Sequence, residues 1–184
     1  GAVPGADEEF ATTVERARGW LRNKAGGVSP HRLAEAITAR YGKDRTFSVP
    51  ILTMCTLAGR LGSDGWSFVT QLPFEMAAFP QQMFAALRLP VVSYALPALI
   101  AIGQVRHRHR PSGNPMARIF RDLTRQRTLR VLGQIQPSSG GFLEATPLTS
   151  FVTMSLAGAD HANRPVALNG IRFILASLRP DGSW

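Results

Sequence analysis

An internal repeat in the C-terminal third is the sequence feature that most constrains the fold. Residues 130–142 align without gaps with residues 172–184, 42 positions further along the chain. Basic, aliphatic, glycine and aromatic residues recur in register: Arg130 with Arg172, Leu132 with Ile174, Gly140 with Gly182, and Phe142 with Trp184. Repeats of this length are typical of stacked helix pairs, in which each unit covers the apolar face of its neighbour. The repeat therefore predicts a fold built from helix pairs.

Both copies have the form of a helix, a polar turn and then Gly-x-aromatic. A glycine after a helix C-terminus permits a left-handed turn, and we expect the aromatic side chain to fold back over a neighbouring helix. In the first copy, Gln136 can hydrogen-bond backbone groups left free at a helix end. These roles are structural, and we expect no catalysis at the repeat residues.

The rest of the chain also predicts helices, because long alternating β-branched runs are absent. Ser29-Pro30 has the form of an N-cap followed by a first helical residue, which predicts a helix over 30–41. An exposed linker is expected near 111–115. We therefore expect one all-α domain over 1–184, or a piece of a larger one. The other expected helices cover 6–24, about 48 or 50 to 61, 91–106, 116–135 in one or two pieces, 147–156 and 164–178.

The stretch 66–105 is apolar and interrupted by prolines, and its only charged residues are Glu75 and Arg88. We expect these two side chains to form a structural ion pair, since a buried carboxylate needs a partner. The stretch is a buried wall, a membrane-touching surface or a lipid pocket. Because Pro90 and Pro97 interrupt its longest uncharged part, we predict no transmembrane segment.

The chain carries a net charge of +9, almost all of it from arginine. This excess fits a solvated face or an anionic membrane surface, and nucleic acid is disfavoured because no nucleic-acid motif is present. His107 and His109 alternate with arginines, which favours a solvated or phosphate-facing role over zinc binding.

Cys55 is the single cysteine and is expected to be a buried structural thiol. No secretory signal is recognised, so we expect a peripheral protein on the cytoplasmic side of a membrane.

Two groups of residues resemble the squalene-hopene and oxidosqualene cyclases. Gln136, Gly140 and Phe142 resemble one copy of their QW motif, in which Gly-x-Trp follows a glutamine. Gly170, Phe173, Gly182 and Trp184 resemble a second copy, with Leu178 at the glutamine position, and 18–27 resembles a third, degenerate one. The segments 72–80 and 93–95 are similar to a Pro-Pro-Glu segment and a Ser-Trp-Ala segment of the bacterial cyclases.

The resemblance implies an α/α-toroid of concentric helices and a membrane-associated enzyme that cyclises a linear C30 isoprenoid such as squalene. It implies that Tyr94 and Phe151 line the substrate cavity, where aromatic faces stabilise carbocations, and that no metal or other cofactor is required. The chain departs from the family in two respects. The acidic Asp-x-Asp-Asp motif is absent, and Thr149 occupies the position of a cavity tryptophan.

These observations leave three interpretations of function. The chain is part of a squalene-hopene cyclase-like triterpene cyclase and forms a wall of its cavity, or it is a non-catalytic cyclase-like protein that binds isoprenoids or lipids or acts as a scaffold. The third interpretation, a protein prenyltransferase β-subunit, is weakened because the zinc site of those proteins needs a Cys/Asp/His set that is not present. We expect that this chain alone does not cyclise squalene.

Overall fold

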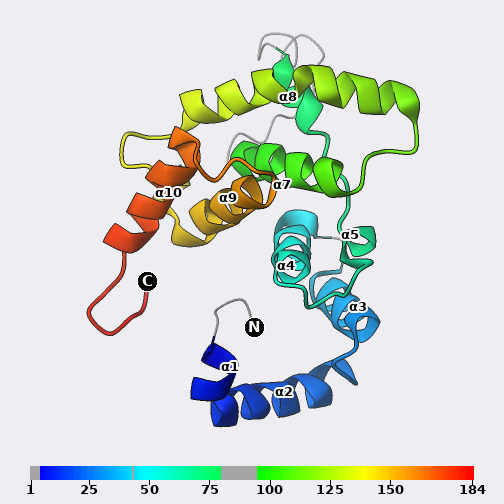
Figure 1. Cartoon of the computed structure of the whole chain (residues 1–184), viewed down its shortest axis with the longest axis vertical. Coiled ribbons are helices and arrows are strands. Elements are labelled where there is room, and N and C mark those ends of the chain that lie inside the picture. Colours follow the sequence, from blue (N-terminus) through cyan, green and yellow to red (C-terminus); the bar gives the residue numbers. More distant parts are fainter. Residues whose placement is uncertain (1–4, 43, 80–94) are drawn as a thin grey trace. The chain divides into compact units, whose positions relative to one another are not determined.

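The computed structural model describes residues 5–42, 44–79 and 95–184. Every regular element in these ranges is a helix, so the predicted all-α class is confirmed for them. The contacts divide the chain into two compact units, Gly1–Val69 and Thr70–Trp184, each of which is described by itself. Figure 1 shows the helices of both.

The first unit contains short and medium helices joined by glycine turns: α1 (Ala6–Glu9), α2 (Ala11–Ala25), α3 (Pro30–Tyr41), α4 (Arg45–Leu57) and α5 (Gly65–Phe68). The predicted start of α3 is confirmed, because the Ser29 side chain accepts a hydrogen bond from the backbone N–H of Arg32 and Pro30 opens the helix. The core of this unit contains Val49, Leu52, Leu61 and Val69.

The helix predicted to start at Ser48 or Pro50 begins earlier, at Arg45. The Asp44 carboxylate accepts a hydrogen bond of 2.8 Å from the backbone N–H of Thr46, and this cap starts the helix one turn before Pro50. Pro50 is buried within α4. The helix ends at Leu57 rather than Leu61, because Gly59 takes a left-handed conformation with φ of 70°.

The second unit contains η1 (Phe74–Ala78), α7 (Leu96–His109), α8 (Pro115–Ile135), η3 (Phe142–Glu144), α9 (Thr146–Gly158) and α10 (Pro165–Ala176). In this unit α9 packs between α7 and α10, while α8 packs on α7 and η1 (Figure 1). Eight buried residues form its core: Ile100, Ala101, Leu129, Leu132, Phe142, Val152, Leu156 and Ala167. The aromatic residue of the first repeat copy is therefore part of this core.

The two long helices of this unit differ from expectation at their ends. The basic run after Val105 continues α7 as far as His109, because no glycine or proline ends the helix before Pro111. The start predicted for this helix, Val91, lies outside the described residues. The loop 110–114 leads to α8, which is one continuous helix whose N-cap, Asn114, accepts hydrogen bonds from the next turn. Within the described ranges, no helix is long and apolar enough to cross a membrane.

Candidate functional site

The structure describes only one of the two residues predicted to line a substrate cavity, Tyr94 and Phe151. Tyr94 lies outside the described residues. Phe151 lies on α9 and is half-buried. Thr149, which the resemblance to the cyclases pairs with a cavity tryptophan, is fully buried. Its hydroxyl accepts a hydrogen bond from the Phe142 N–H and donates one to the Ala145 carbonyl, both 2.9 Å. The Thr149 hydroxyl thus holds the turn that precedes α9.

The first repeat copy joins the end of α8 to the start of α10. The Gln136 amide donates hydrogen bonds to the carbonyl of Gly140 at 2.9 Å and to that of Val166 at 3.0 Å. Val166 lies in the first turn of α10, so Gln136 ties two helices together across a turn. Gly140 has φ of +87°, and a Cβ there would lie 2.4 Å from the carbonyl oxygen of Asn169. This position therefore requires glycine on two grounds.

The second copy repeats the turn without the glutamine contact. Gly182 has φ of +79°, and the Trp184 indole N–H donates to the Ile174 carbonyl at 2.8 Å. Trp184 is 58% exposed, whereas Phe142 at the equivalent position is buried. Leu178, at the position of Gln136, is also exposed. The Phe173 ring packs so closely on the first copy that a Cβ at Gly141 would lie 2.4 Å from it.

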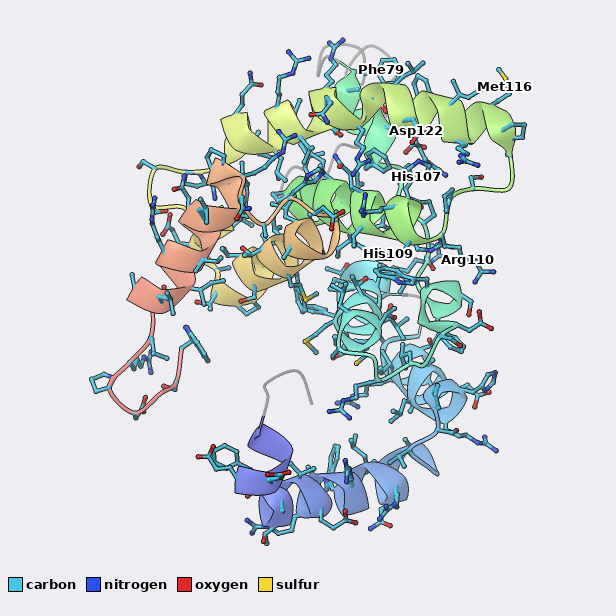
Figure 2. All side chains as sticks on the ribbon, viewed as in Figure 1. Phe79, His107, His109, Arg110, Met116 and Asp122 are labelled. Atoms are coloured by element: carbon cyan, nitrogen blue, oxygen red, sulfur yellow. The ribbon has the colours of Figure 1, made fainter. Side chains whose placement is uncertain are left out.

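Polar pairs hold α8 against α7 and η1. The His107 Nε2 atom lies 2.9 Å from Asp122 Oδ1, and the His107 side chain is only 5% exposed (Figure 2). Of the solvated or phosphate-facing role predicted for His107 and His109, the solvated role is therefore wrong for His107, whereas His109 is exposed. His107 follows Ile100 and Gln104 on the inward face of α7, because the helix continues through the basic run.

Glu75 forms its ion pair with a residue that the sequence did not point to. Its carboxylate lies 3.0 Å from Arg121 Nη2 on α8, and both side chains are 13% exposed. Arg88, the expected partner, lies outside the described residues. The carboxylate is thus used to attach η1 to α8, as expected for a structural ion pair.

An exposed apolar row lies on the N-terminal half of α8. Its residues are Met116, the adjacent pair Ile119 and Phe120, and Leu123, so that each step along the helix face is three or four residues. Met116 and Leu123 are 75% and 76% exposed. Arg127 and Arg130 continue the same face at this spacing and are exposed. Phe79 stacks on Phe120 with ring centroids 5.9 Å apart, and Figure 2 shows Met116 pointing away from the ribbon. The spacing was visible in the sequence, but its exposure was not.

The first unit contains a separate groove of about 1060 Å³ between α2, α3 and α4. Its walls are mainly apolar and include Val14, Leu21, Leu33, Ile37 and Ile51. Among the described residues of this unit, four cations and no carboxylate line the groove: Arg18, Lys24, Arg40 and Arg60. Cys55 lies in this wall and is half-buried rather than fully buried, and burial raises the pKa of its thiol.

No group of three or more metal-ligating side chains is found in 5–42, 44–79 and 95–184. Comparisons of the chain with protein-family models, curated proteins and solved structures find no match. The assignment to a class of proteins therefore depends on the repeat geometry and on the two surfaces just described.

Proposed function

We propose that this chain is part of a squalene-hopene cyclase-like α/α-toroid protein that handles a linear C30 isoprenoid while docked on an anionic membrane. The observation that carries the proposal is the apolar row of α8, which the arginines Arg127 and Arg130 continue on the same face. A substrate of this kind is held in the bilayer, so a protein that takes it up needs a face that enters the membrane surface.

The chemistry of this face suits a shallow insertion. Fully burying a side chain the size of Leu or Met is worth about 1.5–3 kcal/mol, and each arginine near an anionic surface adds about 1 kcal/mol. Arginine side chains at the edge of an apolar face can keep their charge at the level of the lipid phosphates. Asp122, on the same helix, is directed to His107 instead.

The repeat units support the toroid part of the proposal. Gln136 joins the end of α8 to the first turn of α10, and the turn glycines of both copies, Gly140 and Gly182, have positive φ. The second repeat copy leaves apolar residues exposed, Leu175 and Trp184 among them, which a further repeat could cover. This is the behaviour expected of stacked repeats.

The groove of the first unit favours a second candidate function, isoprenoid or lipid binding without cyclisation. It has apolar walls and enough volume for a chain-like ligand. Both candidate functions use the apolar row of α8 to dock on the membrane, and they differ in whether the bound isoprenoid is cyclised.

Two measurements test these proposals. Sedimentation with phosphatidylglycerol vesicles should carry the protein into the pellet at low salt and less so at high salt, because part of the attraction is screened. Incubation with squalene followed by mass spectrometry should give bound but unchanged squalene. Absence from the pellet at low salt would contradict the membrane proposal, and a polycyclic product would exclude the non-catalytic candidate.

A further inference from the structure

Positive charge converges at the corner of the second unit formed by the end of α7, the middle of α8 and the turn before α10. Three arginines, one from each of these elements, lie near His161: Arg125 contacts its ring, the Arg164 N–H donates to its carbonyl, and Arg108 pairs with the preceding Asp160. The Arg125 Nη2 atom lies 3.4 Å from His161 Nε2, and the His161 residue is 9% exposed. The guanidinium groups therefore share one small region, although they are distant in sequence.

The local backbone explains how His161 comes to lie there. Asp160 takes a left-handed conformation with φ of 61° after the end of α9, and the His161 N–H donates back to the Leu156 carbonyl at 2.8 Å. The His161 carbonyl then accepts from the Arg164 N–H at 3.1 Å. This tight turn brings His161 and Arg164 next to the middle of α8.

The charges in this corner are only partly balanced. Arg108 pairs with Asp160, and Asp122 is hydrogen-bonded to His107 while its charge also acts on Arg125. Within the described ranges, Arg125 and Arg164 form no ion pair, and Arg164 donates to the neutral Gln126 amide at 3.0 Å. Burial, and then the charges of Arg125, Arg164 and Arg108, lower the pKa of His161 to about 4, so the ring is neutral near pH 7.

The N-terminus of α10 adds to the same positive potential. Its N-cap is Arg164, which makes no side-chain cap, and Pro165 is its first residue. Ser, Thr, Asp and Asn are the usual caps, and a cation is unfavourable at the positive end of a helix dipole. An anion with several oxygens would therefore be stabilised here, because it could accept hydrogen bonds from the three guanidinium groups and lie near the helix N-terminus.

We propose that Arg108, Arg125 and Arg164 form a binding site for a phosphate-type anion, either a free phosphate ester or diphosphate or the phosphomonoester head group of a lipid. Arg108 and Arg164 are exposed and Arg125 is half-buried, so an anion can enter from solvent. The site is distinct from the apolar row of α8 and does not depend on the proposed membrane docking when the anion is soluble.

Inorganic pyrophosphate, titrated calorimetrically in the absence of membranes, is the probe for a soluble ligand. Arg125→Gln and Arg164→Gln should each weaken its binding about 10-fold, as expected for a lost charge-assisted hydrogen bond. Arg118→Gln is the matched control, because it removes the same charge from an exposed position on α8. Leu123→Asp should leave pyrophosphate binding unchanged, which separates this site from the membrane surface. The exposed Arg164 serves as the second variant if Arg125→Gln folds poorly.

Vesicles test the lipid source of the same anion. Phosphatidic acid and phosphatidylglycerol vesicles matched in surface charge are compared, and a preference for phosphatidic acid that Arg125→Gln and Arg164→Gln abolish supports a lipid head group. Pyrophosphate binding that depends on these two arginines supports a soluble ligand. The site is overturned if neither probe binds, or if Arg118→Gln weakens binding as much as the other two variants.

Discussion

The side-chain amide of Gln136 donates a 3.0 Å hydrogen bond to the carbonyl oxygen of Val166, and so connects the end of α8 to the first turn of α10. The same amide donates to the Gly140 carbonyl within the intervening turn. One half-buried side chain therefore fixes both the turn after α8 and the approach of α10.

Replacing Gln136 with alanine should destabilise the second unit by about 1–3 kcal/mol, because two backbone carbonyls lose their side-chain donor. Urea unfolding followed by circular dichroism measures the change in free energy. Gln126→Ala is the control, since that exposed amide accepts one hydrogen bond from Arg164. Its effect should stay within about 0.5 kcal/mol. Equal effects of the two substitutions would contradict a connecting role for Gln136.

The two turn glycines offer a matched pair of substitutions. Gly140→Ala combines a positive φ with a Cβ that would lie 2.4 Å from the Asn169 carbonyl oxygen, and we expect it to cost more than about 3 kcal/mol. Gly182→Ala has a similar φ but no atom within 4 Å of the added Cβ, and it should cost about 1 kcal/mol. Thermal unfolding of both variants measures the difference. Similar melting temperatures would show that Asn169 does not pack against this turn.

The low pKa of His161 predicts that stability depends on pH. The pKa falls from the ordinary 6.5 to about 4 in the folded protein, so protonation favours the unfolded state. The stabilisation is fully present above pH 6.5 and is lost as the pH falls toward 4. The ring is nearly inaccessible but close to the surface, and solvent screening reduces the effect to about 1–2 kcal/mol.

Urea unfolding between pH 4.5 and 7.5 measures how the free energy of unfolding depends on pH. His161→Gln should remove the part of this dependence that comes from His161, and the part that comes from the carboxylates should remain. A histidine NMR titration should place the pKa of His161 below 5 and raise it when pyrophosphate binds. An unperturbed titration near 6.5 would contradict the arrangement of the three arginines.

Local features of the fold could be predicted from the sequence. Ser29 and Pro30 define the start of α3 because capping depends on adjacent residues, and the 42-residue offset predicted two turns with left-handed glycines. The all-α class followed from the same periodicity. Boundaries set by a less obvious cap, such as Asp44 at the start of α4, were misplaced.

Features that depend on distant partners could not be predicted. The burial of His107 and the pairing of Glu75 with Arg121 require knowing which face of α8 meets α7 and η1. In the cluster around His161, Arg125 contacts His161 from 36 positions away in the sequence, and Arg108 pairs with Asp160 from 52 positions away. The Thr149 hydroxyl accepts a hydrogen bond from the Phe142 N–H in the turn before α9, a contact that the resemblance to the cyclases did not suggest.

The exposed apolar row of α8 is the basis of the proposed membrane docking, and a single substitution in it provides the most direct test. Leu123→Asp should reduce the partitioning of the protein onto phosphatidylglycerol vesicles at low salt about 10-fold or more. The substitution removes roughly 1.5–3 kcal/mol of apolar burial and adds a negative charge that the anionic lipids repel. Leu175→Asp, at a 62% exposed position on α10, is the matched control and should bind as the unaltered protein does. Equal binding of the Leu123→Asp variant and the unaltered protein would contradict the account.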